Sequence, residues 1–376
     1  MKTTLFAPAL FIALAFIGCD KRQGNLKTIE SENQQFAVDT LAKGLTNPWG
    51  AAFLPDGKIL ITERKGVIRI FKDGELQEQT IEDVPAVFAK GQGGLLDITL
   101  HPDYATNGWI YLTYSKPGAN GASTTVSRAK LDGNKFVEFQ ELFSAQPFVD
   151  SDYHFGSRIV FDGEGHMFVS SGERGDKPSA QTLSNHLGKV LRLNDDGSVP
   201  KDNPFVNTPD AKPEIWSYGH RNPQGLFYDR DTKTLWEAEH GPKGGDELNR
   251  VEKGKNYGWP IITYGIDYDG KPISDITEKE GLEQPVFYWV PSIATCGITQ
   301  VKGELYPGWK NNILVGGLIL THVARIELND KGQFLKQEKL LDKVGRVRLV
   351  TQDAEGYLYV LTESPGLLLK LIPVKK

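Results

Sequence analysis

Cysteines and clustered basic residues are scarce in this chain of 376 residues. It has two cysteines, seven histidines and a formal net charge of −5. Two cysteines cannot build a disulfide-rich scaffold, and no Cys/His cluster has the spacing of a zinc site. Because Lys and Arg are nowhere concentrated, nothing in the sequence indicates a nucleic-acid partner. A helical period of useful length is also missing, while the composition is ordinary for a globular protein with a sizeable core.

The N-terminus carries an apolar run, Leu5 to Ile17, behind the positive charge of Lys2. This run is too short to span a bilayer as a mature helix, so it predicts a cleaved leader. Its end, Phe16-Ile17-Gly18-Cys19, resembles a bacterial lipobox, in which the cysteine is lipidated and becomes the new N-terminus. We therefore expect a lipoprotein signal peptide at residues 1–18 and a polar tether at residues 19–35.

This leader places the protein outside the cytoplasm, as a periplasmic or cell-surface lipoprotein held at a membrane surface through Cys19. The alternative is a secretory leader without lipid, in which the cysteine is a coincidence. If Cys19 carries a lipid, Cys296 has no partner for an intramolecular disulfide. The apolar residues around Cys296 favour a buried small hydrophobe over a nucleophile.

A loose repeat runs through the rest of the chain: a short apolar strand, a turn rich in Asp and Gly, and a second strand. Six copies can be aligned, at residues 49–63, 95–114, 157–173, 224–241, 298–317 and 347–363. Runs such as ILIT, WIYLTY and YLYVLT have β-branched and aromatic residues at strand length, and the turns suit hairpins. Six copies of one strand unit predict an all-β fold, a six-bladed β-propeller of four-stranded antiparallel blades at residues 36–376.

Two neighbouring motifs concentrate unusual chemistry. The first is GHRNPQGL, residues 219–226, and the second is EHGPKGGDELNRVEKGKNYGWP, residues 239–260. Pro223 favours an extended backbone at Asn222, and the Gly241-Pro242 pair forces a sharp loop with carbonyls available to a cation or ligand. The alternative is that the Gly-Pro and Gly-Gly pairs only end strands.

These motifs resemble the soluble aldose sugar dehydrogenases, which are relatives of soluble quinoprotein glucose dehydrogenase. The resemblance extends from about Phe36 to about Pro373. It rests on the two motifs above and on three more, in the family's order: GQGGLLDITLHPDY at residues 91–104, YHFGSRIVFD at residues 153–162 and QPVFYW at residues 284–289. The resemblance implies an oxidoreductase that uses pyrroloquinoline quinone (PQQ) and calcium.

The resemblance also assigns site residues. His154 matches the base that removes the substrate hydroxyl proton, and a lone histidine can otherwise be structural. Arg221 and Asn222 match contacts to PQQ, and Arg221 is expected to stabilise negative charge on the reduced ring. Gln92 and Trp289 match positions that line the cofactor and substrate cleft, although a large aromatic residue also suits the propeller core.

Two arginines alternate along a predicted strand, Arg346 and Arg348, so their side chains point to one side. Like charges side by side repel unless an anion lies between them, and we interpret the pair as a clamp for cofactor carboxylates. The alternative is a solvated face of an edge strand.

Calcium is the expected cation because carbonyl and carboxylate oxygens suit it. By resemblance, the carbonyls of Gly241 and Pro242 hold the calcium that polarises the quinone. Asp246, Glu247 and Tyr257 match a neighbouring structural calcium site.

Two positions depart from the family pattern. Tyr153 stands where the glucose dehydrogenase has a sugar-binding Asp, which puts the same sugar selectivity in doubt. Ile319 stands where the family has a cofactor-binding Lys, and an apolar side chain cannot replace an ammonium. We expect a weakened or altered cofactor site rather than an inactive one.

The sequence therefore predicts a PQQ- and calcium-dependent oxidoreductase that oxidises aldose sugars at the anomeric carbon to lactones and passes electrons to an unidentified acceptor. Two alternatives remain at this point. One is a calcium-dependent lactonase-like hydrolase, and the other is a quinone-free cell-surface binding propeller, which the apolar Ile319 favours.

Overall fold

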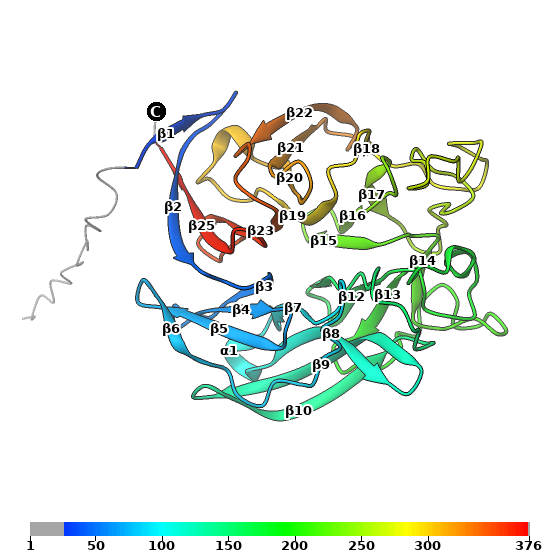
Figure 1. The fold of residues 1–376 in the computed structure, drawn as a ribbon, viewed down its shortest axis with the longest axis horizontal. Helices are drawn as coiled ribbons and strands as arrows, with labels where there is room; N and C mark the ends of the chain where they lie inside the picture. Colours follow the sequence, from blue (N-terminus) through cyan, green and yellow to red (C-terminus); the bar gives the residue numbers. More distant parts are fainter. Residues whose placement is uncertain (1–25, 375–376) are drawn as a thin grey trace, which may run out of the picture.

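The computed structural model describes residues 26–374 and consists almost entirely of antiparallel β-strands. Six sheets, five of four strands and one of five, are arranged in a ring (Figure 1). Within each sheet, neighbouring strands of the sequence pair as hairpins, which is the topology of propeller blades. The predicted fold, a six-bladed β-propeller, is confirmed.

We number the blades in chain order. Blade 1 consists of β3 (Pro48–Phe53), β4 (Ile59–Glu63), β5 (Val67–Lys72) and β6 (Glu75–Thr80). Blade 2 consists of β7 (Leu95–Leu100), β8 (Ile110–Gly118), β9 (Gly121–Asp132) and β10 (Lys135–Ser144). Blade 3 consists of β11 (Ile159–Phe161), β12 (His166–Ser171), β13 (Lys189–Asn194) and β14 (Ile215–Tyr218).

The second half of the ring repeats this arrangement. Blade 4 consists of β15 (Pro223–Asp229), β16 (Thr234–Glu239), β17 (Asp246–Val251) and β18 (Phe287–Trp289). Blade 5 consists of β19 (Thr295–Gln300), β20 (Ile313–Gly317), β21 (Val323–Leu328) and β22 (Phe334–Leu340). Blade 6 consists of β23 (Val347–Gln352), β24 (Leu358–Thr362), β25 (Leu367–Pro373), β2 (Gln35–Lys43) and β1 (Thr28–Glu30). Short helical turns interrupt the connections at α1 (Tyr104–Asn107), η2 (Lys177–Gln181) and η3 (Pro307–Trp309).

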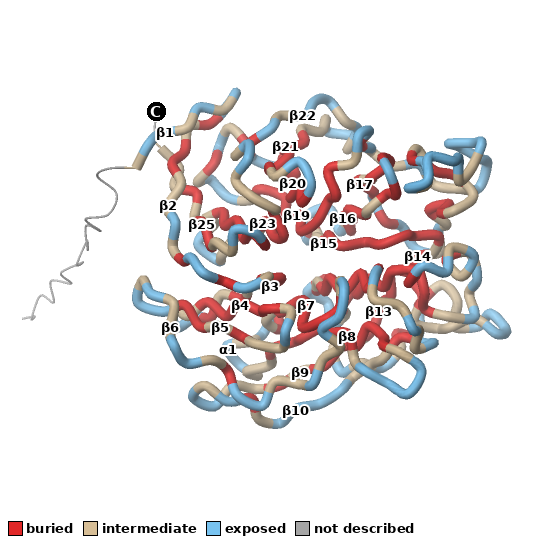
Figure 2. The backbone as a smooth tube through the Cα atoms, viewed as in Figure 1, coloured by how far each residue is buried: buried red, intermediate tan, exposed pale blue. Residues whose placement is uncertain are grey.

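Each of the six sequence repeats forms the first two strands of one blade. These inner strands are rich in β-branched and aliphatic residues, and β4, β20 and β24 are buried along their whole length. The outermost strands are less uniform: β6 (ELQEQT) is polar and has only exposed and half-buried residues, whereas β14 (IWSY) is partly buried. Figure 2 shows the same gradient, with buried backbone near the middle of the ring and exposed backbone at its rim. The sequence repeat therefore marks the inner strands because they are buried on both faces, whereas outer strands have one face in water.

Hydrophobic clusters join the blades. Blades 1 and 2 share one cluster around Leu60 and Leu112, and blades 4 and 5 share another around Leu248 and Val315. The remaining neighbours share four comparable clusters, including one between blade 6 and blade 1. Because each sheet buries both faces against its neighbours, the ring itself is the hydrophobic core.

Both ends of the chain meet in blade 6, where β2 pairs with β25 and so closes the ring. The preceding strand β1 pairs with β2, and the segment after β1 crosses to blade 5. There the indole Nε1 of Trp309 donates a hydrogen bond to Ser31 Oγ at 3.0 Å, and Arg325 lies 3.1 Å from the Glu32 carboxylate. Residues 28–35 are therefore folded onto the propeller, although the sequence places them in the expected tether, 19–35. The predicted signal peptide and Cys19 lie outside the described residues.

The strand directions define two faces of the ring. The first strand of every blade starts on one face, which we call the cavity face, and the second strand ends there. The tight Asp- and Gly-rich turns between these two strands lie on the opposite face. Among residues 26–374, no helix has the length and apolar character that crossing a bilayer requires.

Candidate functional site

The main cavity opens on the cavity face, near the ring axis, and has a volume of about 750 Å³. Two kinds of segment contribute to its walls. Segments of the first kind lead into the first strand of a blade, in blades 2, 5 and 6. Segments of the second kind follow the second strand of a blade, in blades 1, 4, 5 and 6. The chain repeatedly leaves or enters the ring here, so side chains from far-apart segments converge. The residues that the argument below uses are Arg64, Gln92, His240, Gly241, Pro242, Arg346, Arg348 and Glu363.

His154 lies just before blade 3, beside the cavity wall. Its Nδ1 is 2.8 Å from Oε1 of the buried Glu173, so Nδ1–H donates to the carboxylate and the Nε2 lone pair is left to accept a proton. The backbone N–H of His154 donates to Oε1 of Gln92 at 2.9 Å, which ties the histidine to a cavity residue. The predicted base is thus oriented on both sides.

The imidazole is held neutral in a strained backbone. Burial lowers the pKa of His154, and the hydrogen bond to Glu173 opposes that shift. The backbone φ of His154 is 58°, in the left-handed region that a non-glycine residue rarely adopts. Such positions persist where the surroundings determine them, and they cluster at functional sites. A neutral, fixed imidazole is suited to general-base chemistry.

Arg346 lies directly before β23 and Arg348 lies within it, and the two side chains converge on Glu363. Arg346 Nε and Arg348 Nη2 donate to Glu363 Oε2 at 3.2 and 2.8 Å. The anion between the two guanidinium groups is therefore first of all a side chain of this protein. Burial opposes ionisation, but Arg348 and Arg346 hold the pKa of Glu363 below its ordinary value. Arg348 is buried, whereas the side chain of Arg346 is 43% exposed toward the cavity.

Arg221 and Asn222 lie at the entry to blade 4 and are both buried. The Glu239 carboxylate accepts from both of their backbone N–H groups, and Arg221 Nη1 donates to the carbonyls of His240 and Gly241 at 3.1 and 2.9 Å. Asn222 Oδ1 accepts from the Gly156 N–H at 3.1 Å, across the boundary to blade 3. Arg221 therefore stabilises the Gly241-Pro242 corner through these hydrogen bonds. The side chains of Arg221 and Asn222 do not line the main cavity.

Asp246 holds the same corner from the other side. Its carboxylate accepts from Gly241 N–H at 2.9 Å, Ser292 Oγ at 2.6 Å and Thr295 N–H at 3.3 Å. Burial raises the pKa of Asp246. With three protein donors, this carboxylate is engaged in fixing the loop, and the structure does not bring it together with Glu247.

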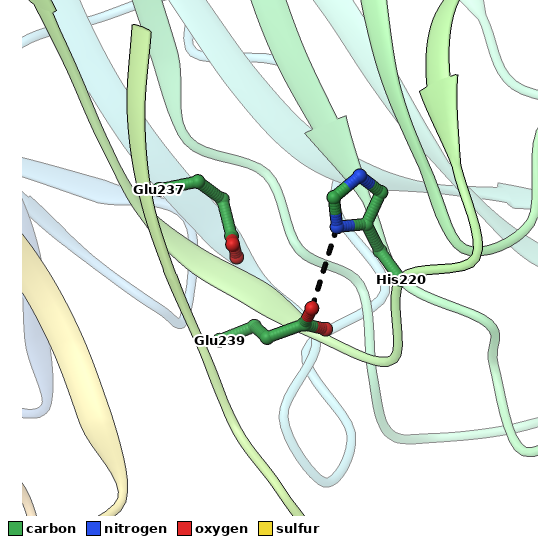
Figure 3. A group of neighbouring side chains, drawn as sticks. All are labelled: His220, Glu237 and Glu239. Carbon is green, nitrogen blue, oxygen red and sulfur yellow. Dashed lines mark hydrogen bonds and ion pairs between the residues drawn. The ribbon is translucent and has the colours of Figure 1, made fainter. Parts of the chain in front are cut away.

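Glu247 and Tyr257 do come together, with Glu239, around a small second cavity. Next to it, ligand atoms of His220, Glu237 and Glu239 lie within 4.8 Å of one another (Figure 3). Burial and the charge of Glu239 raise the pKa of both Glu237 and Glu247, and Glu237 Oε1 has no hydrogen-bond partner. Tyr257 stacks on His220 with ring centroids 4.7 Å apart. Three crowded carboxylates are a set of hard oxygen donors that a divalent cation would neutralise.

Trp289 is not among the residues that line the main cavity, and its position matches the alternative of a propeller-core residue. Side chains alternate around β18, so Trp289 is 4% exposed and packs in the cluster between blades 4 and 5, while Val290 is 63% exposed. Its indole donates to Gln337 at 2.7 Å, and its neighbours Val290 and Pro291 contribute to the cavity wall instead. The register of one strand decides which neighbour reaches the site.

Ile319 lines the cavity at its rim, with 60% of its surface exposed. Cys296 is buried, as the sequence predicts, and its Sγ lies 3.3 Å from Arg348 Nη1. The thiol thus supports the cavity floor from inside and is not itself part of the wall.

The sequence reasoning missed the buried glutamates. Four blades have a glutamate at the end of the second strand or within two residues after it, and each binds the segment that enters the first strand of the same blade. Glu63 accepts from Thr46 N–H, Glu173 binds His154, Glu239 accepts from Arg221 N–H, and Glu363 binds Arg346. The signal was in the repeat, because copies 1, 3 and 6 end on this residue and copy 4 has it two positions before its end.

Comparison with known proteins identifies the chain. The model of the glucose/sorbosone dehydrogenase family matches residues 45–370. The aldose sugar dehydrogenase YliI of Escherichia coli is 43% identical over 343 residues, which cover 89% of this chain and 92% of that protein. A crystal structure of the soluble E. coli aldose sugar dehydrogenase in its apo form superimposes with a TM-score of 0.87 at 41% identity, covering 90% of this chain and 100% of that one.

A more distant structure adds a ligand. The PQQ-bound form of the aldose sugar dehydrogenase of Streptomyces coelicolor superimposes with a TM-score of 0.75 at 28% identity, covering 90% of this chain and 98% of that one. The resemblance seen in the sequence motifs is confirmed across nearly the whole propeller. This chain belongs to the glucose/sorbosone dehydrogenase family.

Proposed function

We propose that this protein is a PQQ- and calcium-dependent aldose sugar dehydrogenase that converts aldoses to lactones. The observation that carries the proposal is the pairing of a neutral, oriented His154 with a cavity rich in arginine on the same face of the ring. A base and an anion-binding cavity are the two parts that a quinoprotein must supply for itself. Family membership and the PQQ-bound relative support the same conclusion.

The charge of the cavity suits a cofactor with several carboxylates. Arg64, Lys243, Arg346 and Arg348 line it, against one carboxylate, Glu363. The Nε atoms of Arg64 and Arg348 are buried without a hydrogen-bond partner. Buried polar atoms of a native protein are normally paired, so these donors fit a ligand that brings its own acceptors. Arg346 and Arg348 would bind the carboxylates.

The donor set also suits calcium. The carbonyls of Gly241 and Pro242 border the cavity, and Arg221 already uses one lone pair of the Gly241 oxygen, which leaves the second for a cation. The separate cluster of Glu237, Glu239 and Glu247 offers carboxylate oxygens that have no ion-paired Lys or Arg side chain within the described residues. A cation there would remove the repulsion between carboxylates that burial intensifies.

In the proposed reaction, His154 Nε2 takes the proton of the anomeric hydroxyl. Glu173 stabilises the imidazolium that forms, because its carboxylate accepts the Nδ1–H at 2.8 Å. A bound quinone supplies the acceptor for the hydride of the sugar carbon, which leaves a lactone. Gln92 holds the backbone of His154, so the base keeps its position while the charge develops.

Tyr153 is the residue that we expect to influence the choice of sugar. Its side chain is 43% exposed and its ring meets His154 edge-on, with centroids 4.9 Å apart. An aromatic wall beside the base offers an apolar contact to a sugar face in place of a carboxylate contact to its hydroxyls. Electrons from the reduced cofactor pass to an acceptor of unknown identity.

We also propose that the protein is an exported lipoprotein anchored through Cys19. Thr28 pairs with Ala37 near the start of β2, which lies on the face opposite the cavity. The chain therefore enters the ring away from the cavity, and an anchor on this side leaves the cavity open to solutes. Replacing Cys19 with Ala should move the protein from the membrane to the soluble fraction, and an unchanged distribution would contradict the anchor.

One experiment tests the proposed function as a whole. The apoprotein, supplied with PQQ and calcium, should reduce a redox dye when glucose or another aldose is added. No dye reduction with PQQ bound would favour a lactonase-like hydrolase, and no PQQ binding at all would favour a binding propeller without a quinone.

A further inference from the structure

Arg64 has no role in the assignments above except as part of the cavity wall. It follows the last residue of β4 in blade 1, on the side of the cavity away from blade 4. Its Nη1 donates to the carbonyl of Gly91, and its Nη2 lies 3.8 Å from Glu363 Oε1. Its side chain is 21% exposed and lines the cavity.

Glu363 therefore gathers three arginines. Its Oε2 serves Arg346 and Arg348, and its Oε1 is directed to Arg64. One carboxylate cannot neutralise three guanidinium groups, and two positive charges are left over in a cavity partly withdrawn from water. Burial lowers the pKa of Arg64, and the charges of Arg348 and Arg346 lower it further, whereas Glu363 opposes the shift. The repulsion among the arginines is a cost that an anionic ligand would remove.

The wall that blade 5 contributes supplies no side-chain charge. At the rim, Leu318 and Ile319 donate their backbone N–H groups to the carbonyls of Ala294 and Ile293. The carbonyl of Leu318 accepts from Arg346 Nη1 at 3.3 Å, and the Ile319 side chain is apolar and exposed. This wall therefore contributes a peptide acceptor and an alkyl group where a cation could have stood.

We propose that Arg64 is a third anion-binding residue of the cavity and supplies the positive charge that position 319 lacks. Its ligand is a compound with at least two carboxylate groups, and the inference rests on the proposed function to the extent that this compound is PQQ. The Gly91 carbonyl and Glu363 fix two edges of the guanidinium group, which leaves Nε without a partner. A planar guanidinium held in this way is suited to a carboxylate.

The test measures binding and not turnover. Apoprotein in calcium is titrated with PQQ by calorimetry, at several salt concentrations, for wild type, Arg64→Gln and Arg64→Lys. Loss of one charge-assisted contact should raise the Kd of Arg64→Gln by about 10- to 100-fold. It should also make the affinity less sensitive to salt. Arg64→Lys should keep the salt dependence and recover part of the affinity, because a lysine keeps the charge but not the planar fork.

Arg69 provides the matched control. Its side chain is 22% exposed and lies 3.7 Å from Glu63, but it does not line the cavity. Arg69→Gln should change the Kd less than about threefold, as expected for a partly exposed ion pair. Equal Kd values for Arg64→Gln and Arg69→Gln would overturn the inference, as would an Arg64→Lys variant that is as weak as Arg64→Gln and has the same salt dependence. Melting curves show whether each variant is folded.

A second probe separates the inference from the proposed function. Citrate, a simple tricarboxylate, is titrated in the same way. If wild type fails to bind PQQ but binds citrate with an affinity that falls in Arg64→Gln, the cofactor proposal fails and the anion site stands. If wild type binds PQQ tightly and Arg64→Gln binds it equally well, the cofactor proposal stands and the role of Arg64 is wrong.

Discussion

His154 and Glu173 form a buried pair in which imidazole Nδ1 lies 2.8 Å from the carboxylate Oε1. Glu173 is 1% exposed and its Oε2 accepts from the backbone N–H of Gly175, so both oxygens of the carboxylate are engaged and its orientation is fixed. The pair fixes the tautomer of His154 and provides a counter-charge when the ring gains a proton. It also gives the base a pH dependence that can be measured.

The first prediction concerns this pair. Glu173→Gln keeps an oxygen acceptor for Nδ1–H but removes the charge, so it should lower kcat by about 10- to 100-fold. Because the Glu173 carboxylate raises the pKa of His154 against the effect of burial, its loss should also move the acid limb of the pH–rate profile to lower pH. PQQ affinity should stay unchanged. A profile at the wild-type position would show that Glu173 only fills space.

The second prediction tests the base itself. His154→Ala should lower turnover by about 10² to 10⁴-fold, the usual range for loss of a general base. Its side chain does not line the main cavity, so the Kd for PQQ should stay close to that of wild type. His166, which pairs with Asp162 on the opposite face, provides a control, and His166→Ala should keep wild-type turnover. Wild-type kcat in His154→Ala would sink the assignment.

The third prediction links calcium to pH. In the metal-free protein, burial and Glu239 raise the pKa of Glu247 from 4.5 to about 8 and raise that of Glu237 as well. The folded state then binds more protons than the unfolded state in this window, so the free energy of unfolding should fall as pH rises through it. A calcium ion bound as proposed would pair with the ionised carboxylates and remove this loss.

Melting temperatures with calcium and with a chelator test this link. The increase on adding calcium should be larger at pH 8 than at pH 5, because protons compete with the ion at the lower pH. Glu247→Gln should reduce the increase at pH 8. An increase that is the same at both pH values would contradict a calcium site at these carboxylates.

The fourth prediction concerns Ile319. A lysine at this position would stand at the rim, where the present side chain is 60% exposed, so water and salt would screen its charge. Ile319→Lys should therefore tighten PQQ binding by only about two- to fivefold, the range for an exposed ion pair. Leu320→Lys adds the same charge at a neighbour that is 40% exposed and does not line the cavity, and it should have no effect. Equal affinities for both variants would show that position 319 does not reach the ligand.

The architecture was predictable from sequence because it depends on a period. Six copies of an apolar strand, an Asp/Gly turn and a second strand were enough to predict six blades, and each copy formed the inner hairpin of one blade. The outer strands were not visible in the repeat, since their composition differs between blades, from ELQEQT in β6 to IWSY in β14. The folded segment around Ser31 and Glu32 was missed because its contacts are with blade 5, about 300 residues away in the chain.

Site residues could be predicted where their residue type is unusual in the sequence. They could not be predicted where strand register or side-chain pairing determines which residue reaches the site. His154, Arg346 and Arg348 stand out in the sequence, and the structure orients all three around carboxylates. Trp289 and Val290 could be distinguished only by the register of β18. Likewise, a glutamate at a strand end does not by itself indicate a functional site. The roles of Glu173 and Glu363 become visible only from their contacts with His154 and Arg348.

The pairing of β2 with β25 also sets the order of events during synthesis. Blades 1 to 5 are each made of consecutive residues, so their hairpins can form as the chain emerges. Blade 6 needs Gln35 and Pro373 together, so the ring cannot close until nearly the last residue has been made. Until then, the face of blade 1 that will meet blade 6 has no partner. For the export that we propose, a ring that closes only at the end of synthesis would keep the chain open enough to cross a membrane.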